Sequence, residues 1–438
     1  MTNYNCRHRL TEHELHKDES RRAAREKEIP DAKFITIAPD HLREAFWSKI
    51  ARPVQGIMYH GWGSLVRAPH GGYRFTNPQT REVLAELVRQ VVEPLGPTLI
   101  QVPDRKSDVA LLESFAAQVF AGRGTYGWSH RWEADMHLIL QWARYQPRIV
   151  YDETILRDGL DPFRVLVMPH CDVLTERVAR AVAEFQKRGG VVVADEHLAP
   201  AIRADITVAS YQRTGKAEAD KAALQQKAAA LRQELGGRYQ PYGDSSDPDV
   251  VVRVRQWGTT DYLFAVNDKR TFGDYVGHHG KVMEKGLAHA ATLSVRRPRG
   301  HVYDLVRHTA VPAATRSGVV AFEASFPPGG GAAFMVTERA IADVRLDAPA
   351  ETRRGGPLRL ETAVVDAANR PLDAVIPVQL EILDPQGRAA EFSGYYGAQG
   401  GKLAVTVDVA ENDLPGKWTV RARELASGKT QEHRVAVQ

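Results

Sequence analysis

The chain has 438 residues, enough for about three domains with cores of their own. Its 58 basic and 54 acidic side chains leave a net charge of +4, which gives no reason to expect nucleic acid or a membrane surface as a partner. The two cysteines, Cys6 and Cys171, lie far apart, which excludes a disulfide framework and a thiolate zinc site.

The sequence contains no apolar run of the length that a membrane span needs, and MTNYNCRHRLTEHELHKDES lacks the apolar core of a signal peptide. We expect a multidomain protein with a cytoplasmic location by default. A truncated N-terminus would remove an export signal.

The N-terminal part changes character at residue 32. Residues 1–31 are polar and carry charges of both signs, which predicts a disordered or helical lead-in. KFITIAP is typical of a short strand, a helix is predicted from Asp40, and VQGIMYHGW is typical of a strand buried on both faces. A further helix is predicted from Asn77 to Pro97. This alternation indicates a parallel sheet or a barrel.

A second α/β domain is predicted over residues 98–240. RIVYDETI, FRVLVMP and VVVADE have the composition of buried strands, and a helix from Thr175 to Gly189-Gly190 joins the last two into a βαβ unit. DVALLESFAAQVF has a helical period, although the unit needs a strand near it. The alanine-rich stretch 217–236 predicts a helix that lies on its own domain.

The remainder of the chain is rich in short strands. Residues 245–341 are predicted to form a small β-domain that begins with a hairpin from VVVRVRQW to YLFAVN. Residues 342–438 are predicted to form a β-sandwich, because strands recur at intervals of about eight to twelve residues between ANRP, DPQG and DLPG turns.

Tyr59, His60 and Trp62 stand at the end of the strand VQGIMYHGW. Functional side chains of α/β proteins gather at the carboxyl ends of parallel strands. An indole ring also offers a flat apolar face to the carbon-bound hydrogens of a sugar. Two interpretations remain open: these three residues bind substrate, or Trp62 only packs the mouth of a barrel.

A second aromatic group, Tyr126, Trp128, His130 and Trp132, lies in GRGTYGWSHRW. Glycines beside aromatic residues predict an ordered loop, and exposed indoles usually have a partner. This group is therefore a candidate cleft or interface. The alternative is a loop folded onto its own domain.

No cofactor and no metal are expected. His278-His279 has no acidic or thiol ligand at a suitable spacing, and no glycine fingerprint for a nucleotide follows the first strand of either α/β domain. Cys171 lacks the glycine elbow of a nucleophile, so a small buried residue is the better interpretation. Asp195 and Glu196 are interpreted as a salt-bridged loop.

Hydrolysis of a glycosidic bond by two carboxyl groups needs a facing pair. The acidic residues between Lys33 and Pro97 are all predicted on helices or helix caps, away from strand ends: Asp40, Glu44, Glu82, Glu86 and Glu93. None of them can be assigned a catalytic role from the sequence.

The order of these pieces resembles a clan A glycoside hydrolase of the family forty-two β-galactosidases. DHLREAFWSKIARPVQGIMYHGWGSLV is similar to the end of the barrel, with its strand eight and tryptophan-bearing tip. Residues 102–208 resemble the trimerisation domain of that family, most closely in FRVLVMPHCDVLTERVARAVAEFQKRGGVVVADE. The segment with YLFAVND and HVYDL resembles the small β-domain that follows in such enzymes.

The resemblance implies a multidomain fold of α/β and all-β parts. An incomplete (β/α) barrel remnant would occupy 32–97, a flavodoxin-like or class I amidotransferase-like parallel sheet 98–240, a small β-domain 245–341 and an immunoglobulin-like β-sandwich 342–438. A complete barrel takes roughly 250 residues, and fewer precede the second domain. The family's catalytic glutamates therefore have no counterpart, and only its strand-eight aromatic carries over, onto Trp62.

The resemblance implies the C-terminal part of a hydrolase that acts on β-glycosides, inactive as this chain alone. The alternative is a non-catalytic module for oligomerisation or carbohydrate contact. Carbohydrate is the expected partner, together with a homo-oligomer for which a trimer is one option. The unclosed barrel predicts that residues 33–97 are poorly ordered or pack against the amidotransferase-like domain.

Overall fold

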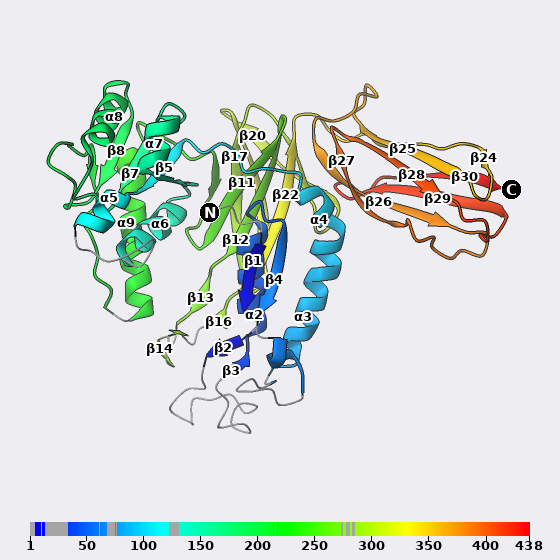
Figure 1. The fold of residues 1–438 in the computed structure, drawn as a ribbon, viewed down its shortest axis with the longest axis horizontal. Helices are drawn as coiled ribbons and strands as arrows, with labels where there is room; N and C mark the ends of the chain where they lie inside the picture. Colours follow the sequence, from blue (N-terminus) through cyan, green and yellow to red (C-terminus); the bar gives the residue numbers. More distant parts are fainter. Residues whose placement is uncertain are drawn as a thin grey trace. The chain divides into compact units, whose positions relative to one another are not determined.

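The computed structural model in Figure 1 describes most of the chain. The described residues are 5–9, 11–13, 34–60, 62–67, 75, 77–121, 131–214, 216–272, 275–276, 281–282 and 285–438. The chain divides into two compact units. Unit 1 comprises Met1–Arg105, Arg253–Lys269 and Gly286–Gln438, and unit 2 comprises Lys106–Val252 and Arg270–Lys285. The finer domain boundaries expected from the sequence stay predictions.

Unit 2 is built on a parallel sheet with the strand order β6-β5-β7-β8-β9. Its strands are β5 (Val109–Glu113), β6 (Arg148–Tyr151), β7 (Val165–Met168), β8 (Val191–Ala194) and β9 (Ile206–Thr207). Counted along the chain, this order is 2-1-3-4-5, that of a doubly wound flavodoxin-like sheet. The direction of winding reverses between β5 and β7, which makes their carboxyl ends the switch point of the sheet.

Helices cover both faces of this sheet. They are α5 (Phe115–Phe120), α6 (Arg131–Trp142), α7 (Asp152–Asp158), α8 (Glu176–Lys187) and α9 (Ala217–Leu235). Successive residues of a strand point to opposite faces. Accordingly, Val109 and Leu111 of β5 join a core with α6 and α9, whereas Ala110 and Leu112 join a core with α7 and α8.

The sequence predictions for unit 2 are confirmed where local patterns carried them. Helix α8 begins after Thr175, whose hydroxyl accepts a hydrogen bond from the Val178 amide at 3.4 Å. Helix α9 packs on its own unit through Leu224 and Leu231. The ambiguous segment DVALLESFAAQVF contains both a strand and a helix, since strand β5 ends at Glu113 and helix α5 begins at Phe115.

Unit 2 also contains four short strands: β10 (Gly243–Ser245), β13 (Arg270–Thr271), β14 (Tyr275–Val276) and β15 (Lys281–Val282).

Unit 1 contains a β-domain with two sheets. One has the order β11-β12-β22-β18-β19, from β11 (Val250–Trp257), β12 (Thr260–Asn267), β22 (Gly331–Thr337), β18 (His301–Asp304) and β19 (Thr309–Val311). In the other, β21 (Val319–Phe326) pairs with β17 (His289–Arg296) and β20 (Ala314–Arg316). The predicted hairpin of β11 and β12 is thus confirmed. The short β16 (Lys285–Gly286) precedes β17.

The segment predicted as a barrel remnant forms a layer on the β-domain. It contains β3 (Phe34–Thr36), α2 (Pro39–Ile50), β4 (Gly56–His60), the 3-10 helix η2 (Trp62–Leu65), α3 (Gln79–Leu87), the π-helical η3 (Val88–Val92) and α4 (Glu93–Leu99). Phe46 and Trp47 share a core with Phe264 of β12. A Cβ at Gly331 would lie 2.4 Å from Cγ of Trp47, so only glycine allows this approach. The prediction that the segment packs against the parallel-sheet domain is therefore wrong.

Two short strands lie within residues 1–31, for which the sequence predicted a disordered or helical lead-in. β1 (Asn5–Arg9) pairs parallel with β4, and β2 (Thr11–His13) pairs antiparallel with β3. Charged side chains are common on edge strands, so the polar composition of residues 5–13 gave no sign of β1 and β2. The other residues of 1–31 lie outside the described residues. Among the described residues, β4 pairs only with β1, in a two-stranded sheet rather than a closed ring.

The last hundred residues form one curled sheet of eight strands over a shared core, and the immunoglobulin-like sandwich expected there stays a prediction. Its order is β23 (Asp343–Asp347), β25 (Pro357–Val365), β28 (Lys402–Asp408), β27 (Gly394–Gln399), β26 (Val375–Leu383), β29 (Gly416–Glu424), β30 (Thr430–Val437) and β24 (Glu351–Thr352). Leu360, Ile382 and Trp418 contribute to its core. No helix in the described ranges is both long and apolar enough to cross a membrane.

Candidate functional site

The carboxyl end of β4 carries two of the three residues predicted to bind substrate. Tyr59 is half-buried in β4, and its burial raises the pKa of its hydroxyl to about 12, so the phenol stays protonated at neutral pH. Trp62 begins η2 and is 58% exposed. The hydroxyl of Thr36 donates to the carbonyl of Ser64 at 2.7 Å and thereby ties η2 to the end of β3. The indole of Trp62 is thus mostly exposed to solvent in this chain, and both interpretations of its role stay predictions.

Several predicted site residues cannot be placed. His60 ends strand β4, but its side chain lies outside the described residues. Tyr126, Trp128 and His130 also lie outside them, as does the pair His278-His279. The structure therefore leaves the proposed cleft or interface in GRGTYGWSHRW a prediction.

All five acidic residues between Lys33 and Pro97 lie in helices, as expected. Asp40 and Glu44 are in α2, Glu82 and Glu86 are in α3, and Glu93 begins α4. The carboxylate of Asp40 accepts a hydrogen bond from the amide of Gly286 at 2.7 Å, which joins α2 to the β-domain. None of these five residues lies on a strand, which is where the barrel enzymes of the resemblance carry their catalytic carboxylates.

Trp132 does have a clear role, at the carboxyl edge of the parallel sheet in unit 2. It is buried in α6, and its indole N–H donates to Oδ2 of Asp195 at 2.8 Å. The same oxygen accepts from the amide of His170 at 2.7 Å, and Oδ1 accepts from the amide of His197 at 2.9 Å. Asp195 thus joins α6 to the loops after β7 and β8.

His170 lies at the sharp turn after β7. Its φ of 50° is in the left-handed region, which is uncommon for a residue with a side chain. Nδ1 of its ring lies 3.0 Å from Oε1 of Glu133, and its ring centroid lies 5.3 Å from that of His197. Glu133 is buried, and its Oε2 has no hydrogen-bond partner among the described residues.

A second carboxylate supports the ends of β5 and β6. The hydroxyl of Ser114 donates to Oδ2 of Asp152 at 3.0 Å, and the amide of Ala116 donates to the same oxygen at 3.1 Å. Burial raises the pKa of Asp152, and the two hydrogen bonds oppose that shift. Ser114 also caps α5, since it accepts from the amide of Ala117 at 3.2 Å.

Cys171 is fully buried beside these groups, as the sequence analysis expected. Burial, with a further contribution from the negative charge of Asp195, raises the pKa of its thiol well above the ordinary value. The thiol donates to the carbonyl of Pro169 at 3.4 Å. A fully buried thiol is out of reach of a substrate, so Cys171 packs in the core at this edge of the sheet.

In the loop after β8, the expected salt bridge corresponds to Oε1 of Glu196, which lies 3.6 Å from Nε2 of His197, whereas Asp195 is held by hydrogen bonds. Glu196 binds the amide and hydroxyl of Ser210, and although burial opposes the shift, these hydrogen bonds lower the pKa of Glu196 to about 2. The described residues contain no group of three or more histidine, cysteine, aspartate or glutamate side chains arranged to hold a metal.

In the sequence, the only signal for the hydrogen-bond network around Asp195 was the position of Asp195 after a buried strand.

Comparisons with known proteins give a structural likeness only. No protein-family model and no curated protein sequence match the chain. A β-galactosidase from Bacillus circulans sp. alkalophilus is similar with a TM-score of 0.46 and 14% identity, over 68% of this chain and 52% of the enzyme. A β-galactosidase from Rahnella sp. R3 gives 0.45 and 10%, over 68% and 52%.

An exo-carrageenase from Bacteroides ovatus is also similar, with a TM-score of 0.39 and 12% identity, over 69% of this chain and 40% of that protein. The chain spans about half the length of the β-galactosidases it resembles. The activity of this chain must therefore be argued from its own residues.

Proposed function

We propose that the chain is the C-terminal part of a β-galactosidase-like glycoside hydrolase, which contacts carbohydrate through Trp62 and does not itself hydrolyse glycosidic bonds. The supporting observation is the exposed indole of Trp62 directly after the carboxyl end of parallel strand β4. An exposed tryptophan at such a position offers a stacking face for a sugar ring.

The lack of hydrolysis is inferred from the carboxylates around this position. Cleavage with two carboxyl groups requires them to flank the bond, about 5 to 9.5 Å apart. The acidic residues of the barrel-like segment lie in helices α2, α3 and α4, and one of them, Asp40, is used to bind the β-domain. Among the described residues, β4 pairs only with β1, so no closed ring of strands is present to carry two opposed carboxyl groups.

The test is sugar binding by the full chain with and without the indole. We expect methyl β-galactoside to give saturation-transfer NMR signals with the wild-type chain. Trp62→Ala should weaken binding about tenfold, which corresponds to ~1.4 kcal/mol. Met58→Ala is the matched control, because Met58 is also exposed, in β4 itself. Equal binding by the wild type and Trp62→Ala, or no binding by either, would contradict the proposal.

Self-association is a second candidate function, and helix α5 favours it. Phe120 is 74% exposed, and Phe115 and Val119 on the same short helix are each 50% exposed. Apolar side chains exposed as a group are typical of surfaces that bind another protein. A homo-oligomer would cover them with a second copy of unit 2.

Sedimentation velocity at micromolar concentration tests this candidate. We expect the wild type to sediment as an oligomer and Phe120→Glu to sediment as a monomer, because an acid buried in an apolar contact is costly. Leu287→Glu places the same charge at an exposed apolar position of unit 1 and should leave the oligomer intact. A wild-type chain that is strictly monomeric would exclude self-association.

A further inference from the structure

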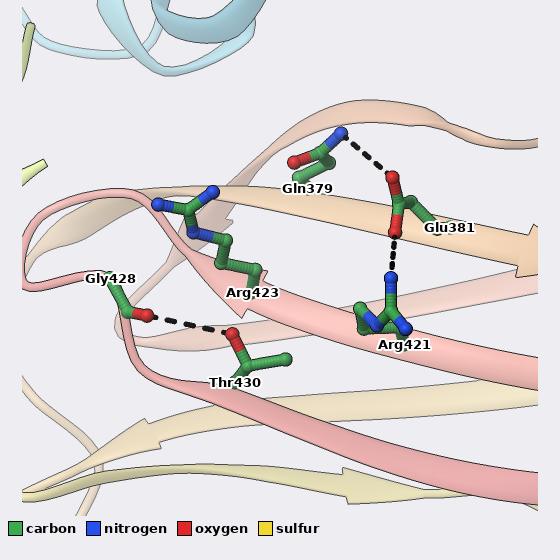
Figure 2. A pocket seen from close by; sticks show the side chains of 6 residues that line it. All are labelled: Gln379, Glu381, Arg421, Arg423, Gly428 and Thr430. Atoms are coloured by element: carbon green, nitrogen blue, oxygen red, sulfur yellow. Dashed lines mark hydrogen bonds and ion pairs between the residues drawn. The ribbon is translucent and has the colours of Figure 1, made fainter.

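The outer face of the C-terminal sheet carries a hollow of about 350 Å³. Figure 2 shows the six residues that line it, which come from β26, from β29 and from the turn and strand that follow: Gln379, Glu381, Arg421, Arg423, Gly428 and Thr430. None of these residues stood out in the sequence, and none belongs to the sites described above.

Strand register explains why these side chains meet. Gln379 of β26 is paired with Arg423 of β29, which is paired with Thr430 of β30. Directly paired residues of adjacent strands point to the same face of a sheet. Two residues along, Glu381 is paired with Arg421 and Arg421 with Glu432. The hollow therefore has two parallel rows of polar groups.

The row of Glu381, Arg421 and Glu432 is paired internally. Arg421 donates to Glu381 at 2.9 Å and to Glu432 at 2.6 Å (Figure 2 shows the first of these). The hydrogen bonds and charges of the two carboxylates raise the pKa of Arg421. One cation between two anions leaves this row with a net charge of −1, and its carboxylate oxygens can still accept hydrogen bonds.

The other row, which consists of Gln379, Arg423 and Thr430, contains a cation that forms no ion pair among the described residues. Arg423 is exposed, and in the described part of the chain no side chain or carbonyl forms a hydrogen bond or ion pair with its guanidinium. Figure 2 accordingly draws no interaction at Arg423, which lies between Gln379 and the Gly428–Thr430 turn. A free guanidinium presents five N–H donors in the geometry that suits a carboxylate or a sulfate.

The wall beside Arg423 is rigid. Glu424, which is fully buried, accepts hydrogen bonds from the amides of Ala426, Ser427 and Lys429 at 2.9 Å. These bonds fix the turn between β29 and β30. Gly428 has a φ of 83° in this turn, and a Cβ there would lie 3.7 Å from Nη2 of Arg423. The turn that forms one side of the hollow is thus held in a single conformation, which lowers the entropic cost of contacts made to it.

We propose that this hollow binds an acidic sugar, with the carboxylate or sulfate group at Arg423 and the sugar hydroxyls at the row of Glu381, Arg421 and Glu432. A bare inorganic anion would gain the contact with Arg423 but would face the net negative row. A neutral sugar would leave Arg423 without a counter-charge. Tyr395 is paired with Gln379 on the neighbouring strand β27, which places it on the same face of the sheet.

The experiment measures binding to the full chain by isothermal titration calorimetry with three oligosaccharides and one salt. The oligosaccharides are tetragalacturonic acid, a sulfated galactotetraose and unmodified galactotetraose, and the salt is sodium sulfate. We expect at least one acidic oligosaccharide to bind at least tenfold more tightly than galactotetraose, and to bind less tightly as ionic strength rises. Which acidic oligosaccharide binds decides between carboxylate and sulfate.

Arg423→Gln should reduce the affinity for the acidic oligosaccharide at least tenfold, and Arg423→Lys should restore part of it. Arg316→Gln, which removes another exposed arginine of unit 1 on β20, is the matched control and should bind as the wild type does. Because Arg423 is exposed, these variants should fold, as circular dichroism would verify. Failure of both acidic oligosaccharides to bind, equal binding by Arg423→Gln, or equally tight binding of sodium sulfate would overturn the proposal. The result is independent of Trp62.

Discussion

Asp195 shows how one buried side chain can organise the edge of a parallel sheet. Its two oxygens accept three hydrogen bonds, from the Trp132 indole and from the backbone amides of His170 and His197. The φ of 50° at His170 is held in place partly by that contact. The network therefore connects helix α6 with two loops at the position where doubly wound sheets usually bind ligands.

Replacing Asp195 by alanine should destabilise unit 2 by about 2 to 4 kcal/mol, because one buried indole donor and two partly buried amide donors would lose their acceptor. Hydrogen exchange measured by mass spectrometry, read on peptides that contain β7 and β8, would report this loss separately from unit 1. Asp161→Ala is the control, since Asp161 is an exposed partner of Arg188 and should matter by less than about 0.5 kcal/mol. Unchanged exchange in Asp195→Ala would contradict the assigned role.

The sequence could place Asp195 at the end of a strand but could not identify its partners. Trp132 lies 63 residues earlier, on a helix whose contact with the loop after β8 is set by the tertiary fold. The burial of Cys171 was predictable from nearby residues alone, because Cys171 follows a buried strand and lacks the flanking glycines that would expose a nucleophile. The row of Gln379, Arg423 and Thr430 was not, because it arises from the register of three strands.

Helices α2 and α4 are held on the β-domain by a buried arginine. Arg255 of β11 is 1% exposed, and its guanidinium donates to carbonyls at the ends of both helices, those of Ile50, Arg52, Leu99 and Val102. Burial lowers the pKa of Arg255 to about 10, so it remains charged at neutral pH. A cation near helix C-termini also satisfies carbonyls that have no partner within the helix.

Arg255→Met should therefore cost about 3 kcal/mol or more, since four carbonyls lose a charged donor. Faster hydrogen exchange in peptides from α2 and α4 is the expected readout. Arg253→Gln provides the comparison, because Arg253 forms a partly exposed ion pair with Asp104 and should cost under about 1 kcal/mol. An equal effect of the two substitutions would show that Arg255 does not anchor the helices.

Local pattern predicted the individual elements better than their partners. The strands and the helix of the βαβ unit were predicted correctly, because the apolar periodicity and the helix-capping residues that mark them lie within a few residues of one another in the sequence. The contact of α2 with the β-domain was missed, since Trp47 meets Gly331 almost three hundred residues later in the chain. Strand β1 was missed because its partner, β4, lies about fifty residues away and its own residues are polar.

Taken as one polypeptide, the chain combines a doubly wound unit with a β-rich unit in which β1 and β4 form a parallel pair and an exposed tryptophan follows β4. The central claim is that this combination contacts sugars without cleaving them. It depends on the exposure of Trp62 and on the helical placement of the acidic residues near β4.

Turnover of nitrophenyl β-galactoside by the purified full chain tests this claim most directly. The background is the rate measured in buffer that contains the Trp62→Ala variant. We predict that between pH 4 and pH 8 the wild-type chain turns the substrate over no faster than this background. Turnover well above that background, lost when Glu44, Glu82 or Glu86 is replaced by glutamine, would contradict the account.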